Sequence, residues 1–498
     1  MSKKTQEGIT VSKDQDFSEW YTQITQKCEI VDKRIPNSKG FYGYPDWGSR
    51  ILSLLEQLYQ KELDKTGHLP IRTPTLIPET LLKLEQEHAQ GFVPEGWLVT
   101  QGRNNKKLNV KKLLRPTGET IIYPLYHYWV RSHQDLPLKR YEVTSSYRAE
   151  PDNAIFPLLR SHQFYWIEAH DVQATNEQAD QQIKEDMHIF ESVTWKELSL
   201  PFFLFKRPEW DKFAGADYTC AYDTPLPDKK VLQIGTTHNL GQHFSKPFKI
   251  KFIDEKAHEG YTYQTCFGMG ISRILGAIIA IHGDNQGLVL PPPIAPVQVI
   301  ITPILVKGED KKILAKVKEL ETKLSESGIR VHSDTSAKTP GWKFNHWEMK
   351  GVPIRLEIGP NELKSKKLIL VKRTTKEKLT VAESKIVDSV KETLDKIQKE
   401  LLAKSKKLIS IEEAKSLDDV HKLFKEGSTF IEILFCSQVK CAEKLKEKNI
   451  KVRGIQLFQN KESTVTESEE TANNKAKNQK CIICSKAAKQ SVILAKQY

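Results

Sequence analysis

The sequence lacks the long apolar runs that insertion into a membrane requires. No stretch of roughly 18 apolar residues, enough to cross a bilayer as a helix, occurs in its 498 residues. The polar N-terminus, MSKKTQEGITVSKDQDFSEW, has no apolar segment of the kind found in secretory signal peptides. A hydrophobic fraction of 39% and a mean hydropathy of -0.49 are typical of a globular protein in water. We therefore expect a cytoplasmic protein with no membrane partner.

Cysteine is also scarce, with seven residues in the whole chain, of which four lie near its C-terminal end. Without a signal peptide, such clustering favours metal binding or free thiols over disulfides. The spacings Cys436-x4-Cys441 and Cys481-x2-Cys484 predict a four-thiolate set, which is typical of tetrahedral structural zinc. Reduced thiols without a metal are the alternative.

Positive charge exceeds negative charge in this chain. It has 76 lysines and arginines against 63 aspartates and glutamates, a formal net charge of +13. Such an excess favours a polyanionic partner, with nucleic acid as the leading candidate, although a lysine-rich solvated surface would give the same number. The length favours two or three domains rather than one.

The first part of the chain has a mixed α and β pattern. Apolar residues recur at helical spacing over residues 46–67, with Asp46 as a candidate N-cap and Gly67 as a C-terminal stop. Residues 68–82 are extended, and their prolines suit an edge strand. Residues 183–198 form another amphipathic helical pattern. A proline-rich link at residues 290–296 then marks a domain boundary.

Beyond this link, strand and helix patterns alternate as in a small α/β domain. We expect strands at 297–302, 329–334, 353–359 and 366–373, and helices at 309–328 and 381–407. From about residue 405 a third unit mixes a helix and a strand with the polar segment 460–480, which predicts a mobile loop. The expected domains are residues 1–290, 297–400 and 405–498.

The stretch YRAEPDNAIFPLLRSHQFYW, residues 147–166, combines arginines, a glutamate and aromatic residues around a loop with two prolines. On two antiparallel strands, Arg148 could reach a phosphate bidentately. Phe164 could then lie against a purine, and Glu150 could accept hydrogen bonds from an amine or a metal-bound water. Chance charge on a surface hairpin is the alternative for this stretch taken alone.

Two further stretches favour the nucleotide-binding interpretation over chance charge on a hairpin. FGMGISR, residues 267–273, places Arg273 at the start of an apolar helical run, where a helix favours anions. HLPIRTPTLIP follows a long amphipathic helix. Together the three stretches resemble motifs 1, 2 and 3 of class II aminoacyl-tRNA synthetases, with Arg148, Glu150, Arg160 and Phe164 satisfying motif 2.

Four more stretches narrow the resemblance. LLRPTGET (113–120), WDKFAGADYT (210–219), LQIGTTHNLGQHFSK (232–246) and TPGWKFNHWEMKGVPIRLEIGP (339–360) are similar to prolyl-tRNA synthetases of the archaeal and eukaryotic type. The resemblance implies an α+β fold: an antiparallel-sheet catalytic domain of class II, then an α/β anticodon-binding domain and a small C-terminal α/β domain of zinc type. It also implies ATP-dependent activation of L-proline, transfer to tRNA(Pro), Mg²⁺, a homodimer and a zinc ion on the four cysteines.

The resemblance further implies roles for individual residues. Arg148 and Arg273 would be the catalytic cations. The implied ATP-binding residues are Arg148, Glu150, Arg160, Ser161, Phe164, Gln233, Thr236 and Arg273. The implied proline-binding residues are Thr117, Glu119, Arg148, Trp166, Glu168, His170, Phe213, His238 and Ser272. Glu348 and Arg355 match positions that the family uses on anticodon guanines, and Tyr498 matches a tyrosine that lies toward the active site.

Three residues depart from the family pattern. His162 and Gln163 replace an arginine and an acid, and Asn239 replaces a second histidine. Two alternatives therefore stay open: a tRNA-binding paralogue that has lost catalysis, and a synthetase for another amino acid such as threonine.

Overall fold

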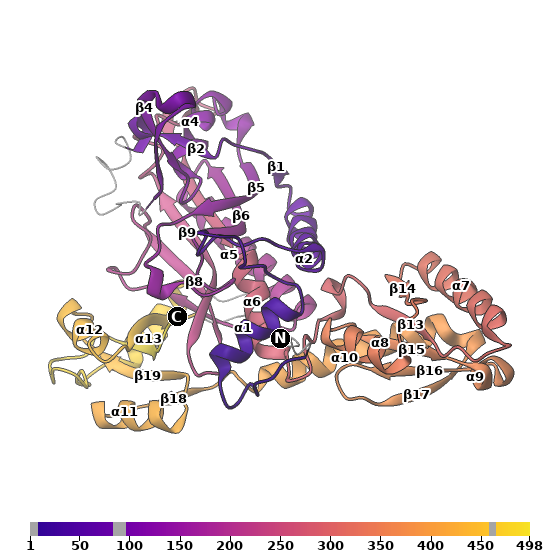
Figure 1. Cartoon of the computed structure of the whole chain (residues 1–498). Helices are drawn as coiled ribbons and strands as arrows, with labels where there is room; N and C mark the ends of the chain where they lie inside the picture. The colour runs from indigo at the N-terminus through magenta and orange to yellow at the C-terminus, as the bar shows by residue number, and fades with distance from the viewer. Residues whose placement is uncertain (1–7, 83–95, 458–464) are drawn as a thin grey trace.

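The computed structural model describes residues 8–82, 96–457 and 465–498. Three units follow one another along the chain (Figure 1). In this view the second unit lies at the lower right of the first unit and the C-terminal unit lies at its lower left. Among the described residues, no helix combines the length and the apolar character that a membrane span requires.

The first unit is built on an antiparallel sheet with helices packed against it. Its helices are α1 (Phe17–Lys27), α2 (Asp46–Lys65), α4 (Glu119–Trp129), α5 (Asn176–Glu191) and α6 (Ile271–His282). Its strands are β1 (Leu69–Pro70), β2 (Leu76–Pro78), β3 (Leu98–Gln101), β4 (Lys107–Leu114), β5 (Leu138–Tyr147), β6 (Gln163–Gln173), β7 (Phe203–Lys206), β8 (Tyr218–Pro225), β9 (Val231–Gly241), β10 (Lys251–Ile253), β11 (Glu259–Tyr261) and β12 (Tyr263–Met269).

The core of this unit lies between the sheet and its helices. Ile274, Leu275 and Ile278 of α6 are fully buried there, and so are Ile51, Leu55 and Tyr59 of α2. Helix α6 is buried on nearly all sides, as expected for a helix that is apolar around its whole circumference. The N-terminus of this buried helix therefore stays in a fixed place relative to the sheet.

The second unit has a five-stranded sheet in the order β14-β13-β15-β16-β17. Strand β13 pairs in parallel with β14 and β15, and the remaining pairs are antiparallel. Its elements are β13 (Val299–Pro303), α7 (Asp310–Glu326), β14 (Val331–Ser333), α8 (Pro340–Met349), β15 (Ile354–Ile358), α9 (Pro360–Ser365), β16 (Lys367–Lys372), β17 (Lys378–Ala382) and α10 (Ile386–Lys406). The predicted α/β character of this segment is confirmed.

The C-terminal unit extends the sheet of the first unit. Its elements are β18 (Ile411–Glu413), α11 (Leu417–Glu426), β19 (Phe430–Phe435), α12 (Val439–Lys446), β20 (Lys451–Gln456), α13 (Val465–Ala476) and β21 (Gln490–Ala495). Because β20 pairs with β7, one sheet of eleven strands runs in the order β1-β5-β6-β12-β9-β8-β7-β20-β21-β19-β18.

Several predicted boundaries need correction. Helix α2 begins at Asp46 with Pro45 as its N-cap, so the predicted N-cap is one residue off, whereas Gly67 has the positive φ of a helix stop. Helix α5 begins earlier than predicted, after the N-cap Thr175, and continues as a π-helical turn over Ser192–Glu197. The segment 68–82, predicted to be extended, contains the short strands β1 and β2, which both lie at sheet edges as expected, but its residues 79–82 are helical.

The predicted mobile loop at 460–480 is wrong in its second part, where α13 forms. Ser468, Ala472 and Ala476 recur every four residues and are buried, so this polar helix presents a face of small residues to the sheet. Residues 460–464 lie outside the described part of the chain.

We expect the close contact between β20 and β7 to make Gly454 irreplaceable. Gly454 has φ of +117°, and a Cβ there would overlap the carbonyl oxygen of Lys206. Gly308 also has a positive φ, +94°, but no atom lies within 4 Å of a Cβ at that position. Both Gly454→Ala and Gly308→Ala carry a backbone cost of about 1–2 kcal/mol, so Gly454→Ala should lower the melting temperature by several degrees more. Equal melting temperatures of the two variants would contradict this contact.

Candidate active site

The hairpin of β5 and β6 positions the residues of the 147–166 stretch. Its strands are antiparallel, with Tyr147 opposite Gln163, as the sequence predicts. At the end of the hairpin where the loop connects the two strands, the Arg148 N–H donates to the carbonyl of His162 at 2.8 Å. The guanidinium carbon of Arg148 then lies 5.0 Å from the ring centroid of Phe164. The hairpin register thereby brings together side chains that are 16 positions apart.

A cavity opens beside this hairpin and is closed on its other side by β9 and the start of α6. Arg273 is fixed there, because its Nε donates to Leu159 O at 2.9 Å and its Nη1 donates to Gln233 O at 3.1 Å. All eight residues predicted to bind ATP line this first cavity: Arg148, Glu150, Arg160, Ser161, Phe164, Gln233, Thr236 and Arg273. The set thus combines three guanidinium groups with an aromatic ring, which suits a nucleotide with its phosphates.

A second cavity adjoins the first, and both are lined by Arg148, Trp166, Gln233, Thr236 and Gly268. Of the residues predicted to bind proline, Thr117, Glu119, Arg148, Trp166, Phe213 and His238 line it. Ser272 lies at the wall of the first cavity instead, where its hydroxyl accepts from the Tyr165 N–H at 2.8 Å. Glu168 and His170 are fully buried, and neither lines the wall of the second cavity among the described residues.

The polar end of the second cavity is anionic. The Thr117 hydroxyl donates to Glu119 at 2.5 Å, and His170 Nε2 lies 3.5 Å from the other oxygen of Glu119. Burial opposes the charge of Glu119, but His170 and Thr117 outweigh it and lower the pKa of Glu119 to about 2. Burial, reinforced by the charge of Glu119, raises the pKa of Glu168 to about 7. Glu119 is therefore the group best placed to meet an ammonium in this cavity.

Aromatic rings form another part of the wall of the second cavity, which Arg207, Asp211 and Lys212 also line. Burial lowers the pKa of His238 to about 4, so its imidazole is neutral at physiological pH. Its Nδ1 lies 2.8 Å from the Thr219 hydroxyl, and its ring lies 4.8 Å from that of Phe213. With Trp166, these uncharged rings lie in the same wall as the cation Arg148 and the anion Glu119. Such a cavity fits an amino acid with a small apolar side chain.

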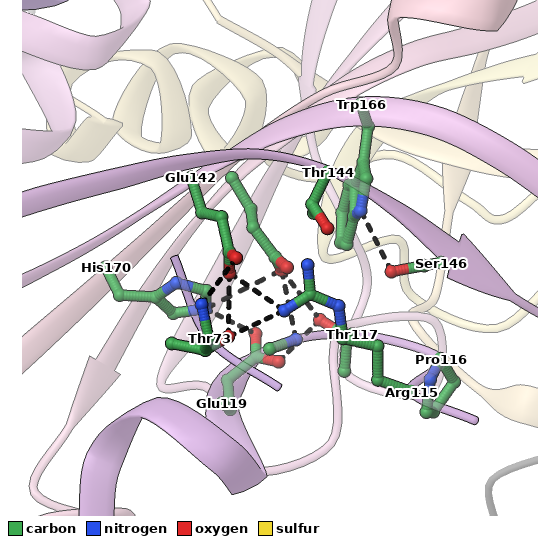
Figure 2. A network of polar contacts seen from close by, with 12 residues as sticks. Thr73, Arg115, Pro116, Thr117, Glu119, Glu142, Thr144, Ser146, Trp166 and His170 are labelled. Atoms are coloured by element: carbon green, nitrogen blue, oxygen red, sulfur yellow. Dashed lines mark hydrogen bonds and ion pairs between the residues drawn. The ribbon is translucent and has the colours of Figure 1, made fainter. Parts of the chain in front are cut away.

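A buried network that the sequence analysis missed supports the loop of Thr117 and Glu119 (Figure 2). Arg115 Nη1 donates to Glu142 at 2.8 Å and to the Thr73 hydroxyl at 2.7 Å. Thr73 donates from its N–H and its hydroxyl to the same carboxylate, at 2.7 and 2.8 Å. Arg115 lies within the LLRPTGET stretch, but Glu142 belongs to β5 and Thr73 to the segment between β1 and β2, so only the fold reveals the network.

The departures from the family pattern leave both cavities intact. Asn239 points to the other side of the sheet, where its Nδ2 donates to Asp180 of α5 at 2.8 Å. His162 lies under the turn from Arg148 to Glu150, with its Nδ1 3.0 Å from Arg148 O and 3.2 Å from Glu150 N. Its ring packs between Phe41 and Trp97. His162 therefore braces motif 2 from behind rather than entering the cavity.

The structure also brings together the residues of the two other predicted sites. Glu348 and Arg355 line a small cavity in the second unit, where the Arg355 guanidinium lies 4.0 Å from the Phe344 ring centroid and Glu348 pairs with Lys376. The sulfurs of Cys436, Cys441, Cys481 and Cys484 all lie within 4.8 Å of one another. Arg160 Nη2 donates to the carbonyl oxygen of Tyr498 at 3.4 Å, so Tyr498 contacts a residue that lines the first cavity.

Known proteins resemble the chain over nearly its whole length. Residues 103–282 match the tRNA synthetase class II core domain (G, H, P, S and T), 298–393 match the anticodon binding domain, and 417–498 match the prolyl-tRNA synthetase C-terminal domain. The proline–tRNA ligase of Thermofilum pendens is 44% identical over 91% of this chain and 94% of its own length. Those of Pyrococcus abyssi and Methanopyrus kandleri are 38% and 40% identical, over 97% of this chain and 98% and 96% of their own lengths.

The chain belongs to the prolyl-tRNA synthetases. The resemblance expected from the sequence is therefore confirmed, as is the class II catalytic fold followed by anticodon-binding and C-terminal domains. The roles of individual residues in this synthetase stay predictions. The lining of the two adjoining cavities indicates which residue could contact which substrate.

The contact of His162 with motif 2 predicts different KM values for ATP in two variants, His162→Asn and His162→Leu, whose new side chains have nearly the same shape. In His162→Asn, the side-chain amide can replace Nδ1 at the Arg148–Glu150 turn. In His162→Leu, a side chain isosteric with asparagine has no polar atom there. We expect His162→Leu to raise the KM for ATP about tenfold, as for the loss of a buried hydrogen bond, and His162→Asn to stay near the wild-type value. Steady-state pyrophosphate exchange at varied ATP measures this. Identical KM values for the two variants would show that the ring acts by packing alone.

Proposed function

We propose that this synthetase activates L-proline with ATP and transfers the prolyl group to tRNA(Pro). The observation that carries the proposal is the position of Arg148, which lines both cavities. One guanidinium can there contact the α-phosphate from one side and the amino-acid carboxylate from the other. The two groups that must react are thus brought together by a single cation.

In the first step, a proline carboxylate oxygen forms a bond to the α-phosphorus, and the bond from this phosphorus to the bridging oxygen of pyrophosphate breaks. Arg148 and Arg273 neutralise charge on the phosphates, and Phe164 stacks on the adenine. Glu150 and Arg160, 3.7 Å apart, hold the nucleotide side of the cavity together with Ser161, Gln233 and Thr236. No side-chain nucleophile is required.

The charges on these phosphates also need a metal ion. Mg²⁺ binds oxygen ligands and supplies further charge neutralisation on the phosphates. The carboxylate of Glu150 offers such oxygens inside the first cavity. The residues present therefore fit a nucleotide that carries Mg²⁺.

In the second step, the terminal ribose hydroxyl of the tRNA attacks the carbonyl carbon of prolyl-adenylate, an ester bond forms, and AMP leaves. Glu119 with Thr117 accepts the secondary ammonium of proline, while Trp166, Phe213 and His238 surround its ring. We assign Glu168 and His170 to the support of Glu119, because both are buried behind it. Ser272 supports the hairpin through Tyr165.

The second unit would then read the anticodon. Arginine can bind the edge of a guanine bidentately, and Arg355 shares a small cavity with Glu348, whose carboxylate can accept from guanine amino groups. The chain's formal net charge of +13 also favours a polyanion.

We further propose a cytoplasmic homodimer. Strand β1 lies at one edge of the large sheet, and Leu69 within it is 54% exposed. An exposed apolar residue on a free sheet edge suits coverage by a second copy of the chain.

The four cysteines fit a structural zinc ion. The sulfurs of Cys436 and Cys441 are 3.5 Å apart, and those of Cys436 and Cys484 are 3.6 Å apart, close to the spacing of thiolates around one tetrahedral metal. Such an ion would supply no chemistry to the aminoacylation reaction, but it would join α12 to the turn before β21.

We expect proline alone among the amino acids to support ATP–pyrophosphate exchange in the wild-type protein. Because Arg148 contacts both substrates in the proposal, Arg148→Ala should lower this exchange at least a thousandfold, and Arg148→Lys should rescue little of it, since lysine lacks the fork. Exchange with threonine, or with no amino acid, would support the alternatives raised above. Near-normal exchange by Arg148→Ala would contradict the site.

Metal analysis of the purified protein should find one zinc per chain. Cys481→Ser should lose this zinc and lower the melting temperature, because a thiolate leaves the set. Cys220→Ser, which changes a buried cysteine of β8 outside the cluster, should keep the zinc. A wild-type protein without zinc, at the same melting temperature with and without chelator, would show that the cluster is a set of reduced thiols.

A further inference from the structure

A chain of buried charges connects the C-terminal unit to the first cavity. It begins at Arg453 of β20, which is 1% exposed. Arg453 donates from Nε to one oxygen of Asp223 at 2.6 Å and from Nη2 to the other at 3.0 Å. Asp223 belongs to β8 of the first unit and is fully buried. The two units thus share a bidentate ion pair that water does not reach.

Arg207 continues this chain toward the cavity. Its Nη2 donates to Asp223 at 2.9 Å and to Gln233 Oε1 at 2.7 Å, while its Nη1 donates to the carbonyl of Arg453 at 3.0 Å. Burial and the neighbouring Arg453 lower the pKa of Arg207 to about 10, so it remains charged at neutral pH. Arg207 therefore contacts Asp223 of the first unit, Arg453 of the C-terminal unit and Gln233, and it lines the second cavity itself.

Gln233 receives its orientation from these contacts. Because Arg207 occupies Oε1, the amide cannot flip, and the donor Nε2 is the end left for a ligand. Arg273 fixes the main chain of the same residue through its contact with Gln233 O. Among the described residues, no acceptor is found for the donor Gln233 Nε2. Gln233 lines both cavities, so a fixed N–H donor faces the place where the two substrates meet.

We propose that Arg453 is a positioning residue for the nucleotide site, acting through Asp223 and Arg207 on the amide of Gln233. The C-terminal unit then contributes to the adenylation site, because one of its residues orients a side chain that lines the nucleotide cavity. This inference rests on the proposed function, since it takes the ligand of Gln233 Nε2 to be an oxygen of ATP.

The charge balance explains why Arg453 matters to Gln233. One carboxylate, Asp223, holds two guanidinium groups, and both arginines outweigh its burial and keep its pKa lowered. Without the guanidinium of Arg453, the Asp223 oxygens are free to take a bidentate contact from Arg207. That movement would withdraw Arg207 from Gln233 and release the amide. A lysine at position 453 keeps the charge but cannot form the bidentate pair.

The test is a double-mutant cycle between Arg453 and Gln233. Arg453→Lys, Gln233→Met and the double variant are compared with wild type in proline-dependent pyrophosphate exchange and in ATP binding measured by tryptophan fluorescence. Each single variant should weaken ATP binding about tenfold, as for a lost buried hydrogen bond. The double variant should bind ATP no more weakly than Gln233→Met, because Arg453 acts through Gln233.

Two outcomes would overturn the proposal. Independent, multiplying losses in the double variant would show that Arg453 only stabilises the fold. Unchanged ATP binding in Arg453→Lys would show that Gln233 does not depend on it. Lys475→Met, which removes an exposed contact with Glu432 in the same unit, is the matched control and should leave ATP binding unchanged.

Two further measurements separate a failure of this proposal from misfolding of a variant and from a failure of the proposed function. If Arg453→Lys does not fold, Asp223→Asn replaces it in the cycle and breaks the same chain from the other unit. ATP binding does not require proline activation, so a wild-type protein that binds ATP but shows no exchange would contradict the proposed function and leave the cycle measurable.

Discussion

The pairing of β5 with β6 is the constraint on which the rest of the site depends. It places the guanidinium of Arg148 where the two cavities meet and the ring of Phe164 beside it. A slip of one residue in this register would turn every side chain of the hairpin to the other face of the sheet. Buried α6 closes the cavity from the other side and carries Arg273 in its first turn. The chemistry proposed here needs no nucleophile, so accuracy of position is its main requirement.

Several buried charges around the site occur in matched sets. Arg115 meets Glu142, Glu119 meets His170, and Asp223 meets Arg207 and Arg453. An unpaired charge at such depth would be costly, whereas a paired and hydrogen-bonded one holds its neighbours in a single arrangement. These sets connect the proline side to β5 and the nucleotide side to the C-terminal unit. They also explain why His162 and Asn239 can differ from the family pattern, since neither belongs to a set.

Sequence reasoning succeeded where the signal is local. The spacing of Arg148, Glu150, Arg160 and Phe164 predicted a hairpin, and the small residues before Arg273 predicted the start of a helix. It failed for α13, whose polar composition hides a narrow face of Ser468, Ala472 and Ala476. The sequence analysis also connected Asn239 with the active site. Neighbouring residues of a strand face opposite sides of the sheet, and because His238 lines the cavity, Asn239 faces away from it.

By itself, the sequence determined the family, the order of the units and part of the lining of the two cavities. Each of these follows from short motifs whose members lie close together along the chain. Only the tertiary structure decided that Arg207, Asp223, Gln233 and Arg453 form one buried chain, and that Glu168 and His170 lie behind Glu119. These contacts join strands distant in sequence, and the pairing of β20 with β7 creates the first of them. No local pattern encodes such a pairing, because it depends on which sheet edge remains free after the first unit has folded.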